Sequence, residues 1–167
     1  MSSATIDFTI AQMQFNRSRT LGSLDRALKL TESTKALGWR PGAGRAHIAW
    51  QLMHVAITEE LFATERLRPE KQTIFAELIP RFRGGSTVDD IIPTAEEIRS
   101  TLDQSRVRLI ETLKSFSDSD LEWKPESLKA RNLSFRDVLN ILVWHEAHHQ
   151  GQVHITLNLF EAGGTSH

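Results

Sequence analysis

Cysteine is absent from this chain of 167 residues. The absence excludes disulfide bonds, thiolate metal ligands and a cysteine nucleophile, so any metal site or active site must be built from other side chains. A chain without cysteine is also compatible with a reducing compartment. Any reactive thiol would have to be supplied by a small molecule.

Long apolar runs and blocks of one charge are also missing. No stretch approaches the roughly 18 apolar residues of a membrane-spanning helix, and the N-terminus has neither the basic nor the apolar region of a signal peptide. The formal net charge is −1 with histidine neutral, and no long basic block is present. Neither nucleic acid nor a membrane is therefore an implied partner, and we expect a cytoplasmic protein that acts on a small molecule.

What is present suits an ordinary globular protein. Hydrophobic residues make up 40% of the chain and charged residues 25%, and the length allows one domain with a substantial core. Alternating apolar runs bounded by hairpin turns are absent, so no strand pattern competes with the helical one. We therefore predict an all-α fold and a single domain over residues 1–167.

Apolar residues recur with helical spacing in four segments of the chain. The spacing predicts helices over about 6–37, 45–68, 94–116 and 134–161. Capping signals at Thr94 and Ser134 mark the starts of the third and fourth helices.

The connection over residues 69–93 contains three prolines and a Gly-Gly pair, and a short helical turn is expected near 72–78. It is longer than usual between helices, which suggests a crossover instead of a tight hairpin. We predict a four-helix bundle with a long crossover connection between helices 2 and 3. The N-terminal half of the fourth helix is apolar on nearly all sides, and such a helix is usually covered all round, which suggests a homodimer.

The fourth helix also carries four of the seven histidines. His145 and His149 are four residues apart, so they share one helix face at a spacing with which two imidazoles can bind one metal ion. His54, near the middle of the second helix, lies on a face that must also look inward. If the two helices are neighbours, these three imidazoles converge into an open site for a divalent metal ion such as Zn²⁺ or Ni²⁺. The alternative is three histidines that are only packed in a core.

Several neighbours of these histidines have open roles. His47 lies on the face of His54, but seven residues correspond to roughly 10 Å along a helix, so both are not expected to bind one ion. His148 lies about 60° from the line of His145. Gln152, one turn beyond His149, is placed either to orient a ligand or bound water or to pack against another helix.

Residues 145–149 also match the H-E-x-x-H pattern of zinc peptidases, in which the glutamate is the general base. The longer metzincin pattern fails, because Gly151 and His154 each come one residue too early. No sheet is expected that would hold an extended peptide. A peptidase is therefore not favoured, and Glu146 is left either as a base acting on water or as a solvated side chain.

Two segments resemble the signatures of the DinB/YfiT-like family. They are Ala46-His47-Ile48-Ala49-Trp50-Gln51-Leu52-Met53-His54-Val55 and Trp144-His145-Glu146-Ala147-His148-His149-Gln150-Gly151-Gln152, and the resemblance extends over roughly residues 6–161. It implies a four-helix bundle with a long connection between helices 2 and 3, often dimeric. It also implies a divalent metal ion held by three histidines, matching His54, His145 and His149.

The resemblance leaves the activity open. Relatives include hydrolases and thiol-dependent S-transferases and isomerases, in which the metal activates a small-molecule thiol. Our first expectation is a metal-dependent hydrolase that activates water. The alternatives are an S-transferase or isomerase that uses a low-molecular-weight thiol, and a non-enzymatic metal-binding helical protein.

Overall fold

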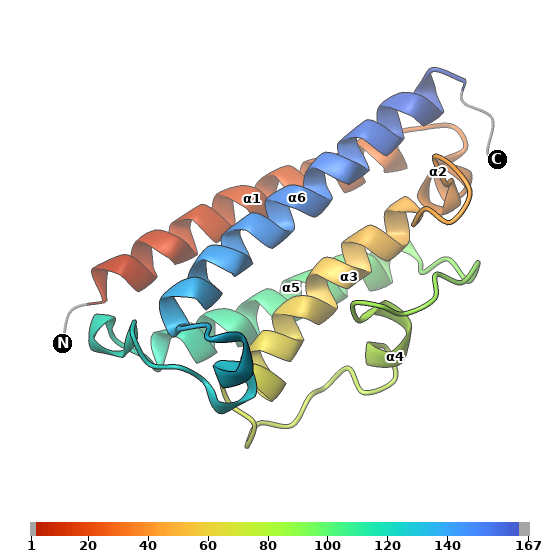
Figure 1. Cartoon of the computed structure of the whole chain (residues 1–167). Coiled ribbons are helices and arrows are strands. Elements are labelled where there is room, and N and C mark those ends of the chain that lie inside the picture. Colours follow the sequence, from red (N-terminus) through yellow and green to blue (C-terminus); the bar gives the residue numbers. More distant parts are fainter. Residues whose placement is uncertain (1–2, 164–167) are drawn as a thin grey trace.

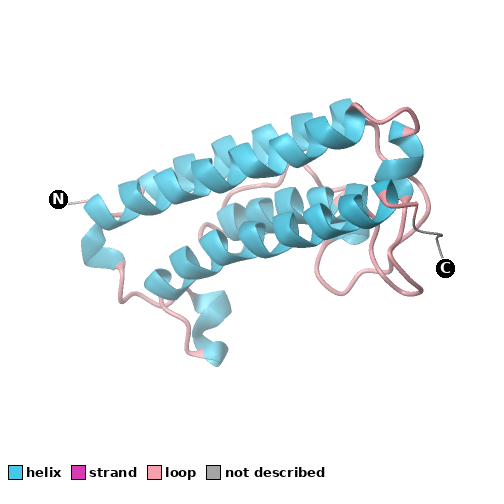
Figure 2. Cartoon of the chain, turned by 90° about the horizontal axis from the view of Figure 1, so that it is seen from above, coloured by secondary structure: helices cyan, strands magenta, loops and turns pink. Residues whose placement is uncertain are grey.

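Helices are the only regular elements in the part of the chain that the structure describes (Figure 2). The computed structural model describes residues 3–163. In chain order the elements are α1 (Ala4–Leu28), α2 (Ser33–Gly38), α3 (Ile48–Leu61), the π-helical turn η1 (Phe62–Arg66), α4 (Ile79–Phe82), α5 (Ala95–Lys114), the 3₁₀ turns η2 (Asp118–Asp120) and η3 (Glu126–Arg131), and α6 (Phe135–Glu161). The all-α prediction is confirmed. Within the described range, no helix has both the length and the hydropathy needed to cross a bilayer.

The long helices form two pairs, and the two members of each pair run in the same direction (Figure 1). In the α1–α6 pair, Asn16 Nδ2 donates to the Val143 carbonyl (2.9 Å). About two turns later on both helices, Gln150 Nε2 donates to Ser23 Oγ (3.3 Å). In the other pair, α3 lies along α5. The two pairs pack against each other with their helices running in opposite directions. Helix α6 therefore crosses α3 in an antiparallel orientation.

The direction of α5 explains the long connection that precedes it. Because α3 and α5 run parallel, the chain from 67 to 94 must return along the molecule before α5 begins. The short helix expected near 72–78 instead lies at Ile79–Phe82. Pro80 fits there, because residues in the first turn of a helix need no N–H donor for an intrahelical hydrogen bond.

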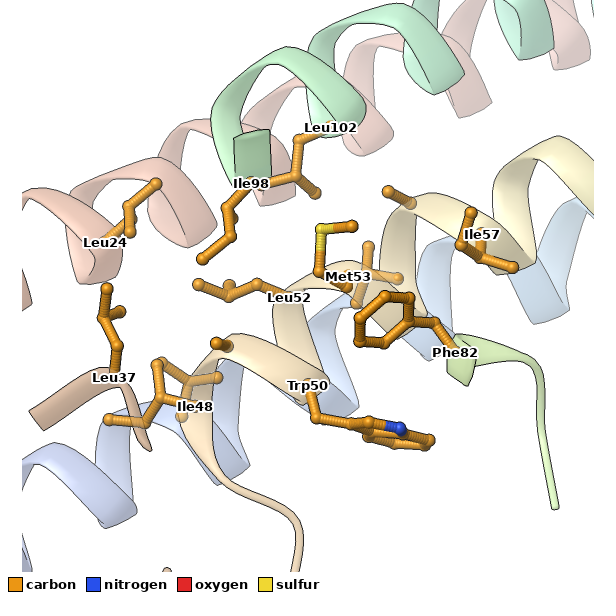
Figure 3. Packing of buried hydrophobic residues seen from close by; sticks show 14 of the residues in the cluster. Leu24, Leu37, Ile48, Trp50, Leu52, Met53, Ile57, Phe82, Ile98 and Leu102 are labelled. Carbon is orange, nitrogen blue, oxygen red and sulfur yellow. The ribbon is translucent and has the colours of Figure 1, made fainter. Parts of the chain in front are cut away.

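The predicted first helix is wrong in its length. It ends at Leu28, and the chain turns before α2 begins at Ser33. In one continuous helix Leu37 would lie about 20 Å beyond Leu24 along the axis. The turn instead folds α2 back, so that both leucines are buried in the cluster around Ile48 (Figure 3).

The second helix begins at Ile48, three residues later than expected, because His47 is its N-cap. Every residue of α3 is buried. It packs against α2, α4, α5 and α6, so this helix is the centre of the core. Leu52, Met53 and Ile57 fill the space between α3 and its neighbours (Figure 3).

The predicted starts of the third and fourth helices are confirmed. Thr94 Oγ1 accepts a hydrogen bond from the Glu97 N–H (3.2 Å), and Glu97 Oε2 accepts one from the Thr94 N–H (2.7 Å). Ser134 and Asp137 form the same reciprocal capping box at the start of α6. Each box satisfies two backbone donors that a helix N-terminus otherwise leaves without a partner.

Candidate metal centre

Three histidines converge where α6 crosses α3. His54 comes from the middle of α3, and His145 and His149 come from successive turns of α6. One ligand nitrogen of each lies within 4.8 Å of those of the other two, and His54 Nε2 is 3.2 Å from His145 Nε2. Two nitrogens that bind one tetrahedral Zn²⁺ at about 2.0–2.1 Å lie roughly 3.4 Å apart. The separation of His54 and His145 is close to this value, and the three nitrogens together are near enough that the group could hold a metal ion.

Two of the imidazoles are oriented by hydrogen bonds from the other ring nitrogen. His54 Nδ1 donates to the Phe82 carbonyl at 2.7 Å, and His149 Nδ1 donates to Gln51 Oε1. Each bond fixes the tautomer in which Nε2 carries the free lone pair. Partners of this kind commonly set the orientation and basicity of metal-binding histidines.

The connection between η1 and α5 contributes to this arrangement. The Trp50 ring stacks on the His54 ring, with centroids 4.7 Å apart and planes at 10°, and Trp50 Nε1 donates to the Arg81 carbonyl at 3.0 Å. This bond holds α4 against α3 and thereby presents the Phe82 carbonyl to His54. The geometry of the site thus depends on residues distant in sequence.

All three imidazoles favour the neutral form. Burial, followed by the nearby His54, lowers the pKa of His145 to about 4. Burial, followed by His145, lowers the pKa of His149 to about 3. Burial also lowers the pKa of His54, against the opposing effect of its bond to Phe82. Because only the neutral imidazole binds a metal, the three rings are ready to act as ligands near pH 7.

His47 lies outside this group and has a structural task. Its Nδ1 accepts a hydrogen bond from the Trp50 N–H (3.0 Å), and its Nε2 donates to the Asp89 carbonyl (3.1 Å). The side chain is buried, and both ring nitrogens are used. His47 therefore caps α3 and is not a rival of His54 as a ligand.

His148 and Gln152 lie beside the histidine group at the surface. Gln152 Nε2 is 2.8 Å from His148 Nε2, and the His148 ring stacks on Trp144 with centroids 4.9 Å apart. His148 is exposed, so it does not take part in the convergence of the other three. The residue of α3 that holds His149 is Gln51, a buried polar side chain for which the sequence analysis predicted no role.

Glu146 is neither solvated nor directed at the histidines. Its side chain is buried and forms ion pairs with Arg17 (2.7 Å from Nε to Oε1) and with Arg106. Both arginines also pair with the buried Glu59. Arg17, Glu59, Arg106 and Glu146 thus form a buried ion network that joins α1, α3, α5 and α6. With its carboxylate engaged there, Glu146 does not occupy the position of a peptidase base.

The buried ion network was not predicted, although the sequence contains a signal for it. Arg17 and Arg106 stand among residues with the spacing of a core-facing stripe, where an apolar side chain is expected. Charged residues are almost never fully buried unless they are paired. Two arginines on core-facing stripes therefore call for buried carboxylates on the facing helices.

A cleft of about 240 Å³ opens onto His54 and His145. Its walls include the apolar side chains of Phe62, Leu128 and Ile141. A second hollow, of about 310 Å³, lies on the side of Gln51 and Gln152. The histidine group is therefore reachable by a small molecule, as a catalytic site requires.

Comparison with protein families gives a match to the DinB superfamily over residues 12–153. The matched range contains all three converging histidines and spans from α1 into α6. No curated protein and no solved structure matches the chain. Since the family match covers most of its 167 residues, the chain belongs to the DinB superfamily.

Proposed function

We propose that the chain is a metal-dependent enzyme whose divalent ion is held by His54, His145 and His149. The observation that carries the proposal is the convergence of three neutral imidazoles within 4.8 Å beside an open cleft. Nitrogen ligands of this kind suit Zn²⁺ or Ni²⁺. A divalent ion bound there would supply Lewis-acid chemistry. Such an ion lowers the pKa of a water or thiol, so that a nucleophile is available near neutral pH.

The residues of the chain set the conditions for this chemistry. Gln51 and the Phe82 carbonyl hold the His149 and His54 rings in place. Part of the cleft wall is apolar, and electrostatic interactions are stronger beside apolar side chains than in bulk water. Hydrolysis of a small molecule is the first reaction class that we propose. Transfer of a low-molecular-weight thiol is the second, and without cysteine the thiol must come from the substrate or a cofactor.

A purely structural metal site is less well supported. Such a site is usually closed by a fourth protein ligand, whereas three histidines beside a cleft leave room for a substrate. A turnover assay with ester, amide and electrophilic substrates, with and without added thiols, separates the two enzymatic alternatives. Absence of turnover in all assays with fully metal-loaded protein would favour the non-enzymatic alternative.

The first test is metal analysis of protein purified without a His-tag. We expect one divalent ion per chain. In His145→Ala this ion should be lost or should bind at least tenfold more weakly. The matched control is His154→Ala, which removes an exposed histidine from the same helix. No stoichiometric ion in the wild-type protein, together with unchanged affinity in His145→Ala, would overturn the proposal.

We further propose that α1, α3, α5 and α6 constitute a four-helix bundle with a crossover over residues 67–94, and that residues 1–167 form one cytoplasmic domain. The packing of α1 on α5 and α6, and of α3 on α5 and α6, supports the bundle and the single domain.

A homodimer is proposed from exposed apolar side chains on α1 and α6, among them Phe8, Phe15, Trp144 and Ile155, which are 60–67% exposed. Sedimentation of the wild type and of Phe15→Glu tests it. A monomeric wild type at micromolar concentration would contradict it.

A further inference from the structure

Two arginines line the cleft that opens onto His54 and His145. They are Arg66, at the end of η1, and Arg131, at the end of η3. Within residues 3–163, no carboxylate forms a hydrogen bond or an ion pair with either guanidinium. A third arginine, Arg83, has only a long contact with Glu65 (3.7 Å) nearby. The charge of Glu65 also acts on Arg66, but Glu65 does not line the cleft. Among the described residues, the two cleft guanidiniums thus carry positive charge that no ion pair neutralises.

The π-helical turn explains how Arg66 reaches the cleft. At about 100° per residue, Arg66 would lie roughly 120° away from His54 on a regular α-helix. In η1 the Leu67 N–H donates to the Phe62 carbonyl at 3.1 Å, which is an i→i+5 bond. The additional residue in this turn rotates Arg66 back toward the face of His54. Turns of this kind are rare and are often found at functional sites.

The position of Arg131 is also supported by specific contacts. Ser127 Oγ donates to the Arg66 carbonyl at 3.2 Å and ties η3 to η1. Asn132 follows in a left-handed conformation, with φ of 57°, which ends η3 directly after Arg131. The backbones that carry the two arginines are thus bonded to each other.

The two guanidiniums repel each other, which destabilises the fold unless another interaction compensates the repulsion. Burial, and next the positive charge of Arg131, lowers the pKa of Arg66, and the opposing effect of Glu65 does not cancel this shift. The Arg66 guanidinium lies over the Phe62 ring, 4.5 Å from its centroid, which restricts its position without neutralising it. An anion placed between the two guanidiniums would remove the repulsion.

We infer that this cleft binds the anionic group of a small amphiphilic ligand through Arg66 and Arg131. Guanidinium groups bind carboxylate and phosphate through paired, charge-assisted hydrogen bonds. The apolar wall formed by Phe62, Leu128 and Ile141 accommodates a short hydrocarbon part. A ligand bound in this cleft would lie against His54 and His145. Its identification as the substrate rests on the proposed function.

The test uses hexanoate, its neutral analogue hexanamide, and inorganic phosphate as probes. Each is titrated by NMR into the full-length protein at low ionic strength, first without metal and, for the two organic probes, again with Zn²⁺. The variants are Arg66→Gln, Arg131→Gln and the double variant. Arg136→Gln is the control, because it removes an exposed arginine of α6 that does not line the cleft.

We expect at least one anion to bind, and its dissociation constant to rise at least about tenfold in the double variant, as for the loss of hydrogen bonds between charged groups. The control should be unchanged, and hexanamide should bind at least about tenfold more weakly than hexanoate if the ligand is a carboxylate. The tighter of hexanoate and phosphate identifies the anionic group. Arg131→Glu, at an exposed side chain, replaces the double variant if that variant does not fold.

The inference is overturned if neither anion binds, or if the affinity of the bound anion stays within twofold in the arginine variants. Failure of both Zn²⁺ and Ni²⁺ to bind would instead contradict the proposed function. The titrations without metal still decide whether the cleft binds anions. A carboxylate that binds only by coordinating Zn²⁺ would do so equally in all the arginine variants, which also counts against the inference.

Discussion

Replacing Glu146 by alanine tests whether this residue stabilises the fold or acts in catalysis. The side chains of Glu146, Arg17 and Arg106 are 2%, 5% and 5% exposed. Among the described residues, removing the carboxylate leaves the two guanidiniums with Glu59 as their one buried counter-ion. Breaking a buried ion pair by removing one partner costs about 3–5 kcal/mol, because the remaining charge is desolvated without compensation.

This cost is large compared with the stability of an ordinary domain, which is about 5–15 kcal/mol. It corresponds to a decrease in melting temperature of roughly 6–20 °C for a chain of this size. Glu146→Gln keeps the shape of the side chain and should also destabilise, by about 2–3 kcal/mol, since it loses hydrogen bonds to charged groups. The assay is urea unfolding followed by circular dichroism.

Glu161→Ala is the matched control on the same helix. Glu161 pairs with Arg26 at the surface, where the two side chains are 33% and 35% exposed. Solvent and salt screen such pairs, so we expect only a small loss of stability. If Glu146→Ala destabilises the protein no more than Glu161→Ala does, the stabilising role of the buried ion network is refuted. A variant of normal stability without activity would restore Glu146 as a candidate base.

Three further predictions concern the site and the helix caps. Gln51→Leu removes the partner of His149 Nδ1 and should weaken metal affinity by about 10–100-fold without abolishing binding, as measured by competition with a chromogenic chelator; unchanged affinity would contradict the orienting role. Acid should destabilise the metal-free protein. An unfolded histidine titrates near pH 6.5, whereas the folded pKa is about 4 for His145 and about 3 for His149. The contribution of these two neutral histidines to the free energy of unfolding is therefore fully present above about pH 6.5 and is lost as the pH decreases toward 3. Urea midpoints that stay constant from pH 7 to 5 would refute this. Thr94→Ala should cost about 1 kcal/mol by removing the cap of α5, whereas Thr94→Ser, which keeps the hydroxyl, should cost less in the same unfolding assay.

The sequence by itself determined the features that depend on neighbouring residues. Helical periodicity predicted the all-α fold, and the residues at Thr94 and Ser134 predicted two helix starts, because a capping box is formed within four consecutive residues. The spacing of His145 and His149 placed both on one helix face. Their segment and the segment around His54 resemble the same family. This resemblance indicated that His54 is the third histidine of the group.

Only the tertiary structure decided the features that depend on contacts between distant segments. The helix breaks after Leu28 because α2 packs on the core. His47 acts as a cap because its ring also forms a hydrogen bond with the Asp89 carbonyl. The engagement of Glu146 requires arginines from two other helices. In each case the outcome depends on a partner far away in the sequence, and local periodicity carries no information about that partner.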